Sequence, residues 1–237
     1  DGLLLRWGNV DAAIALLRQI ARREGLGDLL AEGVREAARR IGDGAERYAF
    51  HSKGLDFPGY DPRGAQGTAL AYAISNRGAD YASVYPSLEY FWTPEQGKEA
   101  FGDEASVHPL RSEGKGRMVR YAYQVSSVLD ALGVCKVPVL SVIGDFSLEP
   151  EARLVSAYTG WDITPDDLFA IGAEIITAER RVNLRYGLTS QDDTLPARFL
   201  EEPAPSGPAK GNVVDLARMV AEYYQAMGWD ENGVPPD

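Results

Sequence analysis

The chain opens with two segments in which apolar residues recur at helical spacing. In the first, Asn9 can act as a cap, Gly25 follows as a stop, and the apolar stripe consists of Val10, Ala13, Ile14, Leu17 and Ile20. In the second, Asp28 can act as the cap, Gly42 ends the pattern, and the stripe consists of Leu30, Val34, Ala37, Ala38 and Ile41. These patterns predict two amphipathic helices that pack antiparallel.

Further helices alternate with long irregular segments. Residues 51–67 are rich in Gly and Pro and predict a loop, and residues 68–78 predict a short buried helix. Helices are also predicted after Thr93-Pro94, from about residue 115, over 149–159 and 216–227, and from Thr164, where a capping box begins a stripe that ends at Gly187. The apolar run "KVPVLSVIG" fits a buried strand or a helical turn equally well.

The fold class that follows is mainly α, with long ordered loops and little or no sheet, because hairpin signals are almost absent. We expect two helical subdomains. The predicted division places residues 1–80 in the first and residues 81–237 in the second, within a zone from about 65 to 115 that contains no clean linker.

Composition narrows the classes of function. The net charge of −11 argues against binding of nucleic acid, and no apolar run approaches the roughly 18 residues of a membrane span. One cysteine cannot form an intrachain disulfide, so a reducing cytoplasm is the expected compartment. Several catalytic signatures are missing, including GxGxxG, GxxxxGK[ST] and GxSxG, and His51 and His108 do not join Cys135 in any familiar zinc spacing.

The segment "VSSVLDALGVCKVPVL" contains the cysteine and is the main chemical candidate. Asp130 falls in the last turn of a predicted helix, where the helix dipole disfavours a negative charge. Gly133 supplies a left-handed turn, and Cys135 follows on a loop beside Lys136, which favours a lowered thiol pKa. From spacing alone, two interpretations stay open: an exposed Asp130 with a structural thiol, or a ligand-binding pair.

A family resemblance bears on that choice. "DALGVC" resembles the DxxGxC motif of the aldehyde ferredoxin oxidoreductase family of tungsten or molybdenum enzymes. Three further blocks are similar in the same order, namely "DGLLLRWGNVDAAIALLRQIARREGLGDLLAEGVREAARRIG", "KGLDFPGYDPRGAQGTALAYAISNRGA" and "VVDLARMVAEYYQAMGWDENGVP". Four collinear blocks cover nearly the whole chain. The resemblance implies helical domains 2 and 3 of such an enzyme.

The resemblance also implies cofactors and roles. Asp130 would accept hydrogen bonds from a tungsten- or molybdenum-bis-pterin, with Gly133 and Val134 beside it, and Cys135 would be one ligand of a [4Fe–4S] cluster. The family's CxxCxxxC cysteines, first pterin motif and N-terminal domain have no counterpart here. We therefore expect the C-terminal part of an enzyme, inactive and without cofactors when alone.

One block departs from the family pattern. After "SNRGA", many members continue with a pair that contains histidine, whereas this chain has Asp80-Tyr81. Either residue could take over proton transfer, or both could simply line a differently shaped pocket. The nearby aromatic residues either contact a bulky substrate or pack between subdomains; they are Tyr85, Tyr90, Phe91 and Trp92.

The expected function is electron transfer between an aldehyde or related carbonyl substrate and ferredoxin. The expected partners are ferredoxin or another electron carrier, the N-terminal domain, and a second copy in a homodimer. Two alternatives remain: a catalytic subunit like that of benzoyl-CoA reduction, and a non-catalytic helical interaction domain.

Overall fold

A computed structural model of the chain describes residues 2–236. These residues are mainly helical, as predicted, and the sheet they contain is one short hairpin of β1 (His51–Ser52) and β2 (Leu55–Asp56). The α-helices are α1 (Val10–Arg22), α2 (Leu26–Leu30), α3 (Val34–Ile41), α4 (Gln66–Ile74), α5 (Tyr81–Val84), α6 (Leu88–Phe91), α7 (Pro94–Phe101), α8 (Lys115–Leu132), α9 (Glu149–Thr159), α10 (Pro165–Arg185), α11 (Ala197–Glu201) and α12 (Leu216–Met227). Short 3-10 turns are η1 (Ala45–Tyr48), η2 (Pro62–Gly64), η3 (Glu104–Val107) and η5 (Ser190–Asp192), and η4 (Val137–Ile143) is a π-helix.

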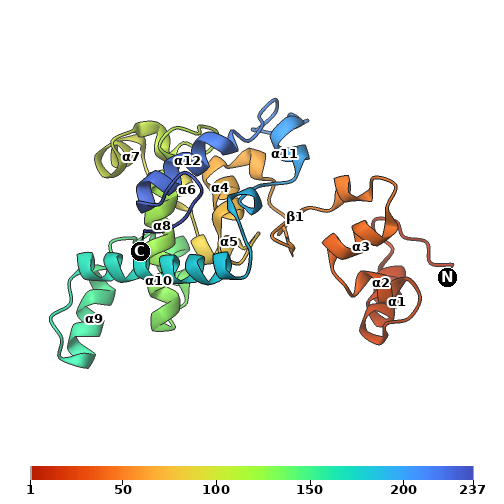
Figure 1. Ribbon diagram of the computed structural model, residues 1–237, viewed down its shortest axis with the longest axis horizontal. Helices are drawn as coiled ribbons and strands as arrows, with labels where there is room; N and C mark the ends of the chain where they lie inside the picture. The colour runs from red at the N-terminus through yellow and green to blue at the C-terminus, as the bar shows by residue number, and fades with distance from the viewer. Residues whose placement is uncertain (1, 237) are drawn as a thin grey trace.

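Helices α1–α3 form an N-terminal unit that stands apart from the other helices and joins them through the segment around β1 (Figure 1). Asn9 caps α1 as predicted, because its side chain accepts a hydrogen bond from the Ala12 amide at 3.1 Å. The prediction of a single helix after Asp28 is wrong, because the structure has two helices there. Gly33, with φ of 83°, separates α2 from α3, and Asp28 lies inside α2 instead of capping it.

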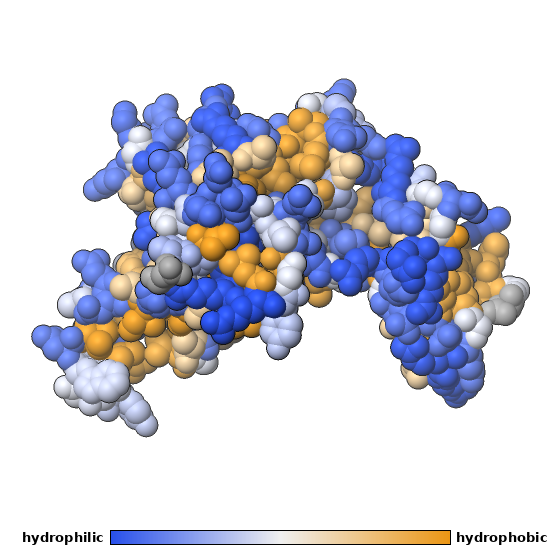
Figure 2. Space-filling view, in the orientation of Figure 1, coloured by the Kyte–Doolittle hydropathy of each residue, from blue (hydrophilic) through white to orange (hydrophobic). Residues whose placement is uncertain are grey.

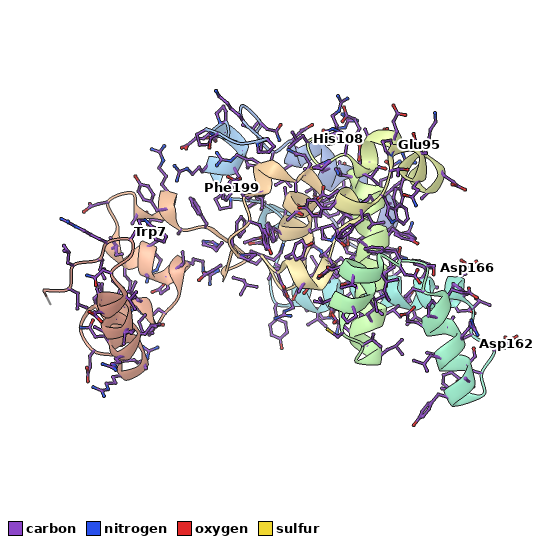
Figure 3. All side chains as sticks on the ribbon, turned by 180° about the vertical axis from the view of Figure 1, so that it is seen from behind. Trp7, Glu95, His108, Asp162, Asp166 and Phe199 are labelled. Carbon is purple, nitrogen blue, oxygen red and sulfur yellow. The ribbon has the colours of Figure 1, made fainter. Side chains whose placement is uncertain are left out.

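The apolar stripe of α1 is largely exposed. The side chains of Val10, Ile14 and Leu17 are exposed. Trp7, labelled in Figure 3, is fully exposed just before the helix. Figure 2 shows hydrophobic surface on this unit and again at the α9 end of the molecule. Within residues 2–236, the amphipathic pattern of α1 therefore does not correspond to a buried face.

The core lies in the remaining helices. All nine residues of α4 are buried, and the helix lies against α8 and α12. Helix α8 is the central element, because it also packs against α5 and α10 (Figure 1). Two glycines allow this close packing: a Cβ on Gly116 would lie 2.4 Å from the backbone of α12, and one on Gly172 would lie 2.6 Å from the Gln124 carbonyl oxygen of α8.

The best local signals correspond to observed helix starts. Thr93 and Thr164 each form a capping box at the beginning of α7 and α10. The ambiguous run after Cys135 is neither a strand nor an ordinary helix, since it forms the π-helix η4. The predicted division near residue 80 stays a prediction. No helix within residues 2–236 is long and apolar enough to cross a membrane.

Candidate functional site

The C-terminal end of α8 has the geometry that the sequence predicted. Gly133 adopts φ of 70°, and the amides of Gly133 and Val134 donate to the carbonyl oxygens of Asp130 and Leu129 at 3.0 and 2.9 Å. This Schellman-type ending satisfies carbonyl groups of the last turn and turns the chain away from the helix axis. The side chain of Asp130 is 61% exposed, Val134 is partly buried against the core, and the Cys135 thiol is exposed.

Lys136 joins two candidate segments that are about fifty residues apart in the sequence. Its side chain is 9% exposed, and its Nζ donates to Oδ2 of Asp130 and to the Ala82 carbonyl oxygen, both at 2.6 Å. Ala82 follows the Asp80-Tyr81 pair in α5. The DxxGxC segment and the Asp80-Tyr81 segment therefore lie next to each other.

Asp80 is occupied by local structure. It caps α5 by accepting hydrogen bonds from the Ala82 amide at 2.9 Å and from the Ser83 hydroxyl at 2.7 Å, and it pairs with Arg77 at 2.8 Å. The side chain is thus fixed by three partners on its own segment. This arrangement favours a positioning role for Asp80, and the predicted catalytic role stays a prediction.

Tyr81 belongs to an aromatic cluster at the start of α5. Its ring lies 5.7 Å from that of Tyr60 and 5.1 Å from that of Tyr85, measured between centroids. Burial, followed by the nearby Tyr90 and Tyr85, raises the pKa of Tyr81 well above the usual range. The hydroxyl is therefore protonated at neutral pH, which makes it a hydrogen-bond donor rather than a resident base.

Tyr85 connects this cluster to the segment after Cys135. Its backbone is left-handed, with φ of 53°, and its hydroxyl forms a hydrogen bond with the Ser141 hydroxyl in η4. The strained backbone at Tyr85 and the π-helical turn at η4 are features that often occur at functional sites. Here they link the aromatic cluster to the loop that holds Cys135.

Tyr60 was missed by the sequence analysis. It lies in the Gly- and Pro-rich loop "FPGYDPRG", more than twenty residues from Tyr81, and is exposed. An aromatic residue in such a loop has no helical or strand pattern to explain it, and that was the available signal. Nearby, the Tyr72 hydroxyl is buried without a hydrogen-bond partner in the described part of the chain.

A metallopterin and an iron–sulfur cluster need hydrogen-bond acceptors and thiolates. The exposed carboxylate of Asp130 and the exposed thiol of Cys135 fit those needs at the α8 terminus. Among residues 2–236, no three His, Cys, Asp or Glu side chains gather to hold a metal ion. The residues present therefore fit one edge of a cofactor site and a single cluster ligand.

Comparison with known proteins identifies the class. The whole chain, residues 1–237, matches the family described as "Aldehyde ferredoxin oxidoreductase, domains 2 & 3". The chain belongs to the aldehyde ferredoxin oxidoreductase family. This finding confirms the resemblance seen in the DxxGxC segment and its three companion blocks.

Individual relatives agree with this assignment. The chain is 38% identical to the tungsten-containing aldehyde ferredoxin oxidoreductase of Pyrococcus furiosus over all of its own length and 37% of the relative. It is 31% identical to the WOR-like subunit of an aliphatic sulfonate oxidoreductase from the same organism, over 35% of that protein. The chain thus spans somewhat more than a third of these relatives.

A solved structure shows the same fold. The active-site complex BamBC of benzoyl coenzyme A reductase, in complex with 1,5-dienoyl-CoA, superposes with a TM-score of 0.71. The match covers 99% of this chain and 38% of that chain at 20% identity. It supports the mainly α architecture.

Proposed function

We propose that this chain is the C-terminal portion of a tungsten- or molybdenum-pterin oxidoreductase that transfers electrons between an aldehyde or related carbonyl substrate and ferredoxin. The observation that carries the proposal is the Lys136 bridge, which joins Asp130 to the segment of Tyr81. The motif that resembles a cofactor-binding sequence therefore lies beside the residues that replace the family's histidine. The single cysteine is compatible with a reducing cytoplasm.

Different residues of this chain would bind the pterin and the cluster. Asp130 accepts hydrogen bonds from the pterin edge, with the backbone of Gly133 and Val134 beside it, and Cys135 provides one thiolate to a [4Fe–4S] cluster. When bound, the metallopterin supplies the two-electron redox chemistry and the cluster conducts electrons onward. Lys136 orients the Asp130 carboxylate through the 2.6 Å contact.

Tyr81 would act on the substrate side. A protonated phenol beside Tyr60 can donate a hydrogen bond to a carbonyl oxygen and so stabilise negative charge that develops there. Asp80 would position Tyr81 by holding the first turn of α5. The raised pKa disfavours Tyr81 as a base at neutral pH, so proton acceptance falls to another group.

A second candidate is reduction of an aromatic acyl thioester. The favouring observation is the aromatic wall of Tyr60, Tyr81 and Tyr85, in which neighbouring rings are 5.1 to 5.7 Å apart. These tilted rings form an apolar surface against which a planar ring can pack. Ferredoxin or another electron carrier, the N-terminal domain and a homodimeric partner belong to both candidates.

The two candidates are separated by assaying the full-length protein with aldehydes and with aromatic acyl-CoA thioesters, using reduced or oxidised ferredoxin. Aldehyde oxidation supports the first candidate, and ring reduction supports the second. Absence of both activities in protein that contains metallopterin would contradict the proposal. It would favour the non-catalytic interaction domain.

A variant tests the bridge itself. Lys136→Met in the full-length protein removes both 2.6 Å contacts, so we expect lower metallopterin content and at least a tenfold loss of activity. Lys98→Met is the matched control, because Lys98 lies exposed on α7. Equal activity and cofactor content in the two variants would show that the bridge has no functional role.

A further inference from the structure

A cavity lies beside the N-terminal half of α8, away from Asp130. It has a volume of about 560 Å³, which is in the range of small-molecule sites, and it is formed by the end of α7, the first half of α8 and the start of α10. Arg120 of this cavity and Asp130 are ten residues apart on one helix, which corresponds to about 15 Å along the axis. The cavity is therefore separate from the candidate cofactor site.

Two arginines in this cavity lack ion-pair partners. Arg117 and Arg120 both line it, and neither forms a salt bridge with a carboxylate of the described chain. The Arg120 Nε is shielded from solvent and has no hydrogen-bond partner among residues 2–236. Because that nitrogen is shielded, an anion in the cavity would take its hydrogen bonds from Arg117 and from the terminal nitrogens of Arg120.

The lining of the cavity carries a small positive charge. Its lining contains two arginines and one carboxylate, Asp166, which gives a local surplus of one positive charge. The chain as a whole has a net charge of −11. Figure 3 marks Asp166 at the beginning of α10, and this residue is part of the cavity lining. The attraction for a small anion would come from the two arginines themselves.

The remaining wall is aromatic. Tyr121 and Phe169 stack with centroids 4.9 Å apart, and Phe101 meets Tyr121 edge to face at 5.6 Å. The Tyr121 hydroxyl is already used, because it donates to the Phe146 carbonyl oxygen at 2.7 Å. Burial, followed by Asp145, raises the pKa of Tyr121 to about 12, so this residue adds no charge at neutral pH. It contributes an apolar ring face.

We propose that this cavity binds a small aromatic carboxylate, with Arg117 and Arg120 on the carboxylate and the rings of Phe101, Tyr121 and Phe169 around the aromatic part. An arginine fork matches a carboxylate in a bidentate manner, and aromatic rings pair in offset or edge-on arrangements. The inference uses only this cavity and does not depend on the proposed redox function.

The test is a titration of the purified 237-residue protein with benzoate, followed by calorimetry and by the NMR signal of the Arg120 Nε–H group. We expect saturable binding of one benzoate with a Kd below about 10 mM and a shift of the Arg120 signal. Acetate, which lacks the ring, and benzamide, which lacks the charge, should each bind at least tenfold more weakly. Benzamide binding as tight as that of benzoate would overturn the proposal.

Variants identify the site. Arg120→Gln should weaken benzoate binding at least tenfold, Arg120→Lys should weaken it less because the charge remains, and Asp166→Asn should strengthen it. Arg153→Gln is the matched control, since it removes the same charge from an exposed position on α9. Circular dichroism verifies folding. Equal weakening by Arg153→Gln and Arg120→Gln, or an absence of saturable benzoate binding, would overturn the proposal.

Discussion

Two opposing electrostatic effects act on the Asp130 carboxylate at the end of α8. The helix dipole disfavours its negative charge by about 0.3–1 kcal/mol. The 2.6 Å pair with Lys136 opposes this, because a largely buried ammonium group that loses an acceptor costs about 1–3 kcal/mol. Since Asp130 is 61% exposed, solvent screening places the gain near the lower end of that range. The pair therefore slightly outweighs the dipole.

The variant Asp130→Asn follows from that balance. We expect the free energy of unfolding to fall by less than about 0.5 kcal/mol, because the loss of the charged pair with Lys136 is largely offset by removal of the unfavourable interaction with the helix dipole. The full-length protein should also retain less metallopterin. Urea unfolding and tungsten or molybdenum analysis measure the two effects. Asp162→Asn, at an exposed loop position, is the control, and equal metallopterin content in mutant and parent would contradict the role of Asp130.

Cys135 should behave differently. Its thiol is exposed and makes no core contact, so Cys135→Ser should change the free energy of unfolding by less than about 0.5 kcal/mol. A serine oxygen is a poorer iron ligand than a thiolate, so the full-length variant should lose or alter its [4Fe–4S] signal. EPR spectra and iron content provide the measurement. An unchanged cluster would mean that another residue is the ligand.

At the residue scale, sequence reasoning identified positions with a local signature and missed those with distant partners. The left-handed Gly133 follows from its place after a helix. The contact of Lys136 with the Ala82 carbonyl oxygen spans 54 residues, and the approach of Tyr60 to Tyr81 spans 21. Neither contact has a periodicity that a single sequence displays, because chain topology brings the partners together.

At the element scale, the buried helix α4 begins without a cap of its own. Ala65 precedes it, and Glu89 of α6 supplies the missing acceptor to the amides of Gly67 and Thr68, each at 2.9 Å. Glu89 also pairs with Lys115 at 2.9 Å, and both side chains are 0% exposed. One carboxylate thus connects three helices in the core.

Loss of that carboxylate should be costly. Glu89→Gln leaves Lys115 buried without a counter-charge, so we expect the free energy of unfolding to fall by about 3–5 kcal/mol. The double variant Glu89→Gln with Lys115→Met should recover part of the loss, because no buried charge remains. Glu95→Gln on the exposed side of α7 should change little. Chemical unfolding of the parent and the three variants measures these free energies. A fall in the free energy of unfolding of less than about 1 kcal/mol in Glu89→Gln would contradict this account.

The predictability of the helices depended on how they start and stop. α10 was located from Thr164, Pro165 and Asp167, whose capping box is present. The break between α2 and α3 was missed because the apolar spacing continues through Gly33, whose positive φ interrupts the backbone hydrogen bonds. The π-helix η4 was not predicted, since its seven residues have no periodic pattern distinct from a strand or helical turn.

At the scale of the whole molecule, the described residues combine a well-packed core with wide apolar exposure. The core is built around α4 and α8, whereas the N-terminal unit and the residues around Cys135 expose large apolar side chains, among them Val137, Val142 and Ile143. Exposed apolar groups gathered beside a candidate cofactor face are typical of a surface that meets another part of a protein. The match to little more than a third of each relative points in the same direction.

The number of cysteines limits which cofactors this chain can hold by itself. A [4Fe–4S] cluster is normally held by four cysteines, and this sequence supplies one, whose thiol is exposed. The pterin would find Asp130 and nearby backbone, on a face open to water. We therefore expect the purified 237-residue chain to fold through its helical core and to contain neither cluster nor metallopterin. Circular dichroism tests the first point and elemental analysis the second; stoichiometric iron together with tungsten or molybdenum would show that these residues suffice to hold both cofactors.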